Sequence, residues 1–145
     1  MTFDLLDVNV WLALAADGHT LHVPAKKWFT GRGETLCAFC RVTQMALLRH
    51  LTNRAVMHGA VLTPEAAWSH YHALLRTTDI VWLAEPEGME PLWEKCSRRA
   101  GATGGWWTDA YLAAFALGHE VRLVTFDRDF RRYEEDGLKL HLLGA

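Results

Sequence analysis

Short apolar runs alternate with longer segments of helical periodicity along this chain. The apolar runs predict strands at residues 3–6, 35–38, 80–83, 120–125 and 138–142. The periodic segments predict helices at residues 10–15, 23–30, 42–51, 64–76, 87–100 and 107–117. Strands that alternate with helices are typical of a parallel sheet covered on both faces, so we expect an α/β fold.

Several residues predict where these helices begin and end. Thr63 and Pro64 form a typical start, with the threonine as N-cap and the proline at the first helical position. Gly118 follows the segment 107–117 and predicts its end, as Gly101 does for the segment 87–100.

Length and composition narrow the class of protein. The 145 residues are 50% hydrophobic and 22% charged, which predicts one folded domain spanning residues 1–145 and excludes a disordered chain. The net charge of −2 means that a nucleic-acid partner would have to bind a local basic patch.

The location of the protein is predicted from the cysteines and from the N-terminal segment. Three cysteines are an odd number and do not form a disulfide framework, which favours a reducing compartment. The first basic residue is Lys26, which does not fit a signal peptide, and the apolar run 8–16 is too short to span a membrane. We therefore expect a cytoplasmic protein with no membrane partner.

Acidic residues lie where a parallel sheet places its functional site. Asp7 follows the first predicted strand, and Asp127 and Thr125 lie at the end of the strand 120–125. Sites in such sheets lie beyond the carboxyl ends of the strands. Asp109 begins the helix 107–117, and Asn9 follows Asp7 closely.

A cluster of carboxylates is costly unless a cation neutralises it, and Mg²⁺ and Mn²⁺ prefer such hard oxygen ligands. A metal held by Asp7, Asp109 and Asp127 would suit phosphodiester hydrolysis, because it activates water and stabilises charge on the phosphate. Each aspartate also has a purely structural interpretation. Asp7 could cap a helix. Asp109 could be an acid in the first turn of a helix, where the helix dipole stabilises its negative charge. Asp127 could form an Asx turn.

Four stretches of the chain resemble the signature motifs of one family. They cover residues 5–12, 40–49, 108–113 and 123–127, in the order expected for PIN-domain proteins. Within that family the chain is most similar to the VapC toxins of bacterial VapBC toxin–antitoxin systems. The resemblance spans nearly the whole chain.

The resemblance implies a three-layer α/β/α fold with a parallel sheet of about five strands. It implies an endoribonuclease that depends on Mg²⁺ or Mn²⁺ and cuts cellular RNA such as tRNA or rRNA. It also implies a homodimer inhibited by a cognate antitoxin, whose C-terminal segment covers the active site. By the same resemblance, Asp7, Asp109 and Asp127 would be the catalytic and metal-binding residues, supported by Asn9 and Thr125.

The chain departs from the family pattern at one position. Many PIN domains carry a glutamate in the second motif, where this chain has Gln44. An amide offers an oxygen but no charge, so Gln44 would bind the metal weakly or only donate and accept hydrogen bonds. This departure motivates an alternative function, a catalytically weak PIN-like module that binds RNA or the antitoxin. Asp129 is a further candidate acid, although a solvated loop position explains it as well.

Basic residues directly follow the last of these acids. Arg128 and Arg131, with Arg132 beside them, would contact RNA phosphates if the segment flanks the acidic cluster. A solvated surface is the alternative interpretation for this group, and we favour it for the basic residues of the helix 87–100.

The tryptophans divide into two groups. Trp106 and Trp107 precede Asp109, and they would either anchor a core or dimer interface or stack on unpaired bases if exposed. We expect the others to lie in the core: Trp11, Trp28, Trp68, Trp82 and Trp93.

Two other chemistries are less well supported by the residues. Cys37 and Cys40 form a CxxC pair, but the second half of a zinc site is missing, and buried structural thiols explain the pair better than redox activity. A phosphatase of the haloacid-dehalogenase type would need a second acid at position 9, where asparagine stands.

Overall fold

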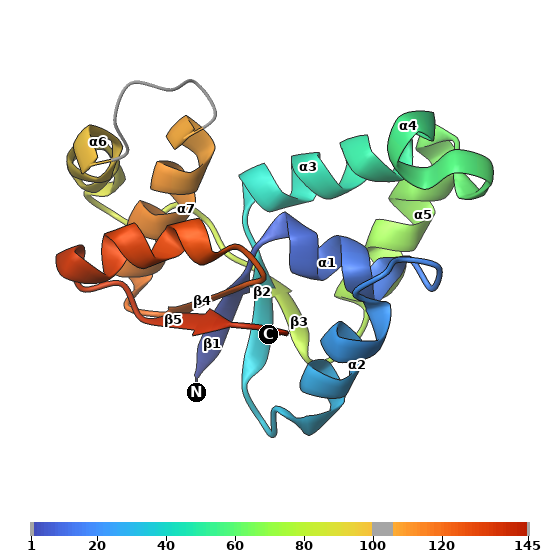
Figure 1. Cartoon of the computed structure of the whole chain (residues 1–145), viewed down its shortest axis with the longest axis horizontal. Coiled ribbons are helices and arrows are strands. Elements are labelled where there is room, and N and C mark those ends of the chain that lie inside the picture. The colour runs from blue at the N-terminus through green and yellow to red at the C-terminus, as the bar shows by residue number, and fades with distance from the viewer. Residues whose placement is uncertain (1, 100–105, 145) are drawn as a thin grey trace.

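The computed structural model describes residues 2–99 and 106–144. Its centre is a sheet of five parallel strands in the order β3-β2-β1-β4-β5 (Figure 1). The strands are β1 (Phe3–Leu6), β2 (Leu36–Phe39), β3 (Ile80–Trp82), β4 (Arg122–Thr125) and β5 (Leu140–Leu142). All five predicted strands are present, and the parallel sheet of about five strands is confirmed.

Helices cover both faces of this sheet, as expected for parallel strands. One side carries α6 (Met89–Arg99), α7 (Trp106–His119) and the 3₁₀ segment η2 (Arg128–Asp136). The other side carries α1 (Val8–Ala15), α2 (His22–Gly31), α3 (Arg41–Leu51) and α5 (Pro64–Leu75). Between α3 and α5 lie the short elements α4 (Arg54–Met57) and η1 (His58–Ala60). The three-layer α/β/α architecture is therefore confirmed.

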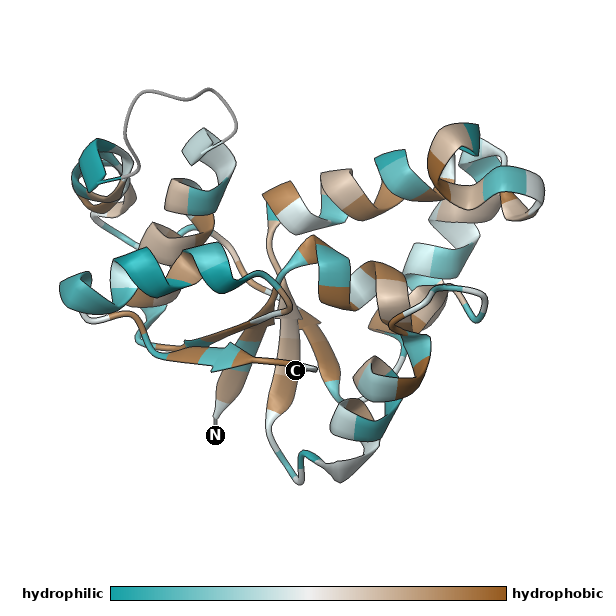
Figure 2. Cartoon of the chain, in the orientation of Figure 1, coloured by the Kyte–Doolittle hydropathy of each residue, from teal (hydrophilic) through white to brown (hydrophobic). Residues whose placement is uncertain are grey.

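Successive residues of the central strands pack into different cores. Leu5 on β1 and Leu123 on β4 lie in the core beneath α7. Leu6 and Val124, the next residues of these strands, lie in the core beneath α1. This follows from the two-residue period of a strand, whose side chains alternate between faces. The strands accordingly form the brown, apolar centre of Figure 2.

The structure contains elements that the sequence patterns did not predict. The segment η2 is strongly polar, yet its Phe130 and Tyr133 are completely buried. Their spacing of three residues matches the period of a 3₁₀ helix. The segment was not predicted because its apolar residues do not follow the 3.6-residue period of an α-helix. α4 was missed because it is only four residues long. The predicted end of the helix 87–100 and Gly101 lie outside the described residues.

The tryptophan predictions are partly wrong. Trp11 is completely buried and stacks on Phe39, with ring centroids 3.8 Å apart. Trp68 and Trp82, expected in the core, are instead 45% and 37% exposed. Trp82 occupies the last position of β3, at an edge of the sheet. Within the described ranges, no helix has the length and apolar character needed to cross a membrane.

Gly118 lies within α7 and does not end it, because α7 continues to His119. A Cβ atom at this position would lie 2.5 Å from Cγ of Pro86. We therefore expect Gly118→Ala to lower the free energy of unfolding by about 1–3 kcal/mol through overpacking. Urea denaturation measures this change. The control is Gly31→Ala, since no atom lies within 4 Å of its added Cβ, and equal stability changes would contradict the prediction.

Candidate active site at the carboxyl ends of the strands

Asp7 is held in place by the ends of two neighbouring strands. It follows β1, and its backbone amide donates to the carbonyl of Val124 on β4. Its Oδ1 accepts a hydrogen bond from the Val8 amide at 2.7 Å as the N-cap of α1. The side chain is only 6% exposed, and this burial raises the pKa of Asp7. The structural role as a helix cap is therefore real, but it uses only one carboxylate oxygen.

The second carboxylate oxygen of Asp7 faces Thr125. The Thr125 hydroxyl forms hydrogen bonds with several residues at this edge of the sheet. The Thr125 hydroxyl donates to Oδ2 of Asp7 at 2.7 Å. The same hydroxyl accepts from Nδ2 of Asn9 at 3.2 Å and from the amide of Asp127 at 3.0 Å. Asn9 also accepts from the Phe126 amide at 3.3 Å. Thr125 is completely buried, so these contacts fix the relative positions of Asp7, Asn9 and Asp127.

Asp109 approaches this cluster from the first turn of α7. Its pKa is raised to about 6, first by partial burial and then by the negative charges of Asp7 and Asp127. A nearby negative charge disfavours the ionised form of a carboxyl group. The structure thus links Asp7 and Asp127 through Thr125, and the charges of both act on Asp109, which comes from a distant segment of the sequence.

The segment after β4 brings another acid and a cation to the same edge. Asp127 accepts from the Asp129 amide at 2.9 Å and begins η2, which bears out its Asx-turn interpretation. The charge of Asp129 raises the pKa of Asp109 further, although its side chain is 66% exposed. Arg132 lowers the same pKa, and its guanidinium lies over the Trp106 ring at 3.5 Å.

Arg132 differs in orientation from the two other basic residues that the sequence named in this segment. Arg128 and Arg131 were the substrate-binding candidates, and both side chains are exposed on η2. Arg132 turns inward, where its Nε donates to the carbonyl of Asp129 at 2.8 Å. Arg132 lies three residues after Asp129, which is one turn of a 3₁₀ helix. A predicted 3₁₀ turn would therefore have indicated the orientation of Arg132.

Gln44 is buried, at 6% exposure, near the start of α3. Its Oε1 accepts a hydrogen bond from Nη1 of Arg41 at 2.6 Å. Of the two roles expected for this amide, the hydrogen-bonding one is therefore present in the structure.

The carboxylate cluster suits a divalent cation in its chemistry. Asp7 and Asp109 are raised in pKa by burial and by neighbouring negative charge, which a cation would offset. Among the described residues, no group of three or more His, Cys, Asp or Glu side chains is arranged to hold a metal ion. The chemistry of the side chains still fits Mg²⁺, which takes oxygen ligands, binds one or two carboxylates directly and keeps several waters.

The cysteines do not form a competing site. Cys37, Cys40 and Cys96 are all buried and free. Burial raises the pKa of all three thiols, to about 12 for Cys37 and about 11 for Cys96. Redox-active thiols need a lowered pKa, so the interpretation of the CxxC pair as structural fits these values.

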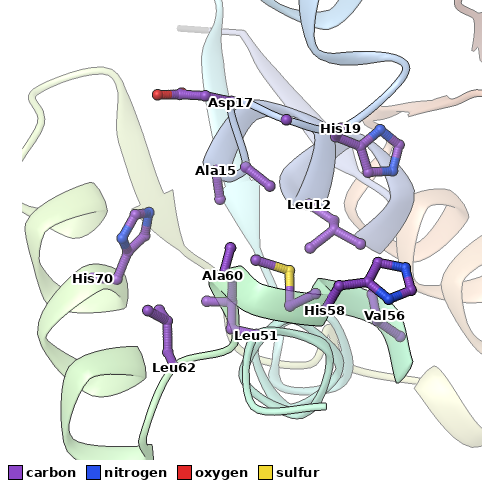
Figure 3. Close-up of a pocket in the computed structure, with 13 residues that line it drawn as sticks. Leu12, Ala15, Asp17, His19, Leu51, Val56, His58, Ala60, Leu62 and His70 are labelled. Atoms are coloured by element: carbon purple, nitrogen blue, oxygen red, sulfur yellow. The ribbon is translucent and has the colours of Figure 1, made fainter. Parts of the chain in front are cut away.

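A separate apolar pocket of about 390 Å³ lies between α1, α5 and the α4–η1 segment (Figure 3). Leu12, Leu51 and Leu62 contribute apolar walls, and His58 and His70 also line it. The carboxylates of the sheet edge do not line this pocket, so it is distinct from the candidate active site.

Comparison with known proteins establishes the family. The PIN domain model matches residues 5–136, and the chain belongs to this family. Its relatives include Ribonuclease VapC41 of Mycobacterium tuberculosis, 44% identical over 144 residues that cover 96% of this chain and 97% of that protein. Ribonuclease VapC44 of the same organism is 32% identical, covering 86% of this chain and 85% of that protein. The resemblance to VapC-type PIN domains is confirmed.

Solved structures agree with this fold. VapBC2 from Rickettsia felis, bound to a promoter DNA fragment, aligns with a TM-score of 0.69 at 12% identity. That alignment covers 99% of this chain and 100% of the other. VapC20 of Mycobacterium tuberculosis, a toxin that cleaves the sarcin–ricin loop, gives 0.64 at 20% identity, with coverage of 88% and 92%.

Proposed function

We propose that the protein is a metal-dependent endoribonuclease toxin of the VapC type, which cuts RNA such as tRNA or rRNA and is neutralised by a cognate VapB-type antitoxin. The observation that carries this proposal is the interaction of Asp7, Asp109 and Asp127 across three separate segments. The ribonuclease names of relatives up to 44% identical support it. RNA is a cytoplasmic substrate, so the proposal includes a cytoplasmic location.

Asp7, Asp109 and Asp127 would hold Mg²⁺ or Mn²⁺, with carboxylate oxygens as ligands either directly or through water. When bound, the metal would lower the pKa of water and stabilise charge on the scissile phosphate. Thr125 orients Asp7 through its 2.7 Å hydrogen bond. Asn9 holds the segment after β4 in place by accepting from the Phe126 amide.

RNA would have to approach an acidic cluster, so nearby cations are needed. Arg128 and Arg131 are exposed on η2, directly after Asp127, and would contact phosphates. Arg132 offsets the charge of Asp109 and lies within the same segment. This local basic patch is consistent with a net charge that is slightly negative overall.

Two protein partners complete the proposal. An antitoxin is supported by solved relatives that are VapBC complexes. A homodimer is supported by large apolar side chains exposed on α3, α5 and β3, namely Met45, Trp68 and Trp82, which are 60%, 45% and 37% exposed. Association with a second copy would remove this apolar surface from water.

Incubation of the purified protein with total RNA tests the enzymatic proposal. We expect endonucleolytic cuts with Mg²⁺ or Mn²⁺, none in EDTA, and recovery when Mn²⁺ is added back. Mapping the new 5′ ends by sequencing identifies the RNA that is cut. Growth arrest on expression, relieved by a small antitoxin gene next to this one, tests the toxin role. Equal cleavage in EDTA and Mn²⁺ would contradict metal dependence.

A catalytically weak binding module is the second candidate function. Gln44 favours it, because this uncharged side chain already accepts a hydrogen bond from Arg41. This alternative predicts that the protein retains RNA in a binding assay without cutting it. It also predicts little increase in the melting temperature when Mn²⁺ is added.

A further inference from the structure

A second pocket is lined in part by the first turns of α7, the helix that carries Asp109, and the proposed chemistry does not use it. This pocket of about 350 Å³ is lined by residues of α3, α6 and α7 and by the segment after β3. Its lining includes Arg41, Glu85, Trp107, Thr108 and Tyr111. An adjoining pocket of about 260 Å³ shares Arg41, Glu85 and Tyr111 with it. Both volumes are at or below the lower end of small-ligand pockets, which suits a single flat group.

The position of this pocket is fixed by the first turns of α7. Trp107 and Tyr111 are four residues apart and therefore lie on the same face of the helix. Thr108, which also lines the pocket, directly precedes Asp109. The same helical turn therefore contributes one residue to this pocket and the next residue to the proposed site of phosphodiester cleavage.

Aromatic rings form one wall of the pocket. The Trp107 side chain is 59% exposed, but its position is fixed by Trp93. Nε1 of Trp93 donates to the Trp107 carbonyl at 3.0 Å, and the two rings meet edge to face with centroids 6.3 Å apart. Trp93 also meets the Tyr111 ring edge to face at 5.4 Å. An exposed indole on such a support is suited to stacking on a planar ligand.

The pocket is also lined by a hydrogen-bond acceptor, Glu85, and a hydrogen-bond donor, Arg41. Glu85 accepts a hydrogen bond at Oε2 from the Tyr111 hydroxyl at 2.7 Å, which orients its carboxylate. Arg41 lies over the Trp82 ring at 4.8 Å and donates from Nη1 to Gln44. A guanidinium has five N–H donors, so Arg41 has others to offer a ligand. The pocket thus combines a carboxyl acceptor, a guanidinium donor and an aromatic stacking surface.

We propose that this pocket binds an unpaired guanine base of the RNA, adjacent to the scissile phosphate. Guanine has two neighbouring N–H donors on its Watson–Crick edge, and these match the oxygens of Glu85. Its O6 and N7 acceptors match the N–H groups of Arg41. Adenine and cytosine place a ring acceptor beside their amino group, and this acceptor would repel a carboxylate. The inference rests on the proposed ribonuclease function and adds a base preference to it.

Cleavage of a single-stranded RNA library of random sequence tests this preference. Sequencing the cut ends is expected to show guanine enriched several-fold at one position beside the cut. Glu85→Gln is expected to reduce that enrichment to less than half, while cleavage itself continues. Trp107→Ala is expected to lower kcat/KM on the order of tenfold, with partial rescue by Trp107→Phe. Trp68→Ala is the control, because this exposed tryptophan on α5 lies outside the pocket.

Binding in EDTA separates this inference from the proposed activity. Fluorescence anisotropy with a short single-stranded RNA is expected to show weaker binding when its guanine is replaced by inosine, which lacks the 2-amino group. Glu85→Gln should abolish this difference. Absence of cleavage together with guanine-selective binding would contradict the ribonuclease proposal alone. Cleavage without guanine enrichment, or enrichment unchanged in Glu85→Gln, would overturn the pocket assignment. Variants that alter only antitoxin inhibition would assign the pocket to the antitoxin.

Discussion

Replacing Asp109 with asparagine is expected to reduce RNA cleavage at least on the order of a thousandfold while stabilising the metal-free protein. The loss of activity follows from the removal of one carboxylate from the set that would hold the metal. The gain in stability follows from the electrostatics of the site. In the folded protein the pKa of Asp109 is raised to about 6, first by burial and then by Asp7 and Asp127.

The sign of this stability effect can be derived from the pKa. A carboxyl group whose pKa is raised by folding binds its proton more tightly in the folded state, so folding is favoured below pH 4 and this benefit is lost between about pH 4 and pH 6. At pH 7 the ionised Asp109 is therefore a cost. Since Asp109 is partly exposed, solvent screening limits this cost to about 1 kcal/mol, or about 3 °C in melting temperature.

Measurements in EDTA at pH 7 test both parts of this prediction. Asp109→Asn should melt at a higher temperature than the parent and should cut RNA far more slowly when Mn²⁺ is supplied. Asp17→Asn is the matched control, because Asp17 is 98% exposed and does not belong to the cluster. A variant that is less stable and fully active would mean that Asp109 serves only the α7 helix.

The sequence predicted the positions of some site residues and not of others. The difference depends on whether a residue lies at the end of a strand or on a helix. Asp7 and Asp127 follow apolar strands and Thr125 ends one, and the rule for carboxyl ends of parallel strands predicts that they share one edge, as their hydrogen bonds show. The same rule does not place Asp109, whose position depends on how α7 packs on the sheet. The hydrogen bonds of Thr125 depend on side-chain directions at the strand end, which the hydrophobic pattern does not contain.

The features that the sequence did not predict lie in segments without a clear hydrophobic period. The inward orientation of Arg132 is one of them, because in η2 a three-residue spacing replaces the α-helical pattern and only Phe130 and Tyr133 are buried apolar residues. Glu85 and Arg41 come together from the segment after β3 and the start of α3, so their shared pocket depends on tertiary packing. Trp107 was named either as an anchor of a core or interface or as a base-stacking residue, and its 59% exposure could not be read from its neighbours in the chain.

Thr125→Val is expected to lower activity about 10–100-fold and the free energy of unfolding by about 2–4 kcal/mol. Valine keeps the shape of the side chain but removes the hydroxyl. Oδ2 of Asp7 then loses its donor at 2.7 Å, and Asn9 and the Asp127 amide lose their acceptor. Because Thr125 is completely buried, water cannot easily replace these contacts. Urea denaturation measures the stability, and cleavage kinetics with Mn²⁺ measure the activity.

The comparison with Thr125→Ser separates positioning from simple loss of stability. Serine keeps the hydroxyl and removes one methyl group, so it should cost about 1 kcal/mol while activity stays within about threefold of the parent. The increase in melting temperature on adding Mn²⁺ gives a further readout, because it reports how well the carboxylates bind the metal. This increase should be smaller in the valine variant than in the serine variant. If both variants respond equally to Mn²⁺ and cut RNA equally well, the hydroxyl does not position Asp7 for metal binding.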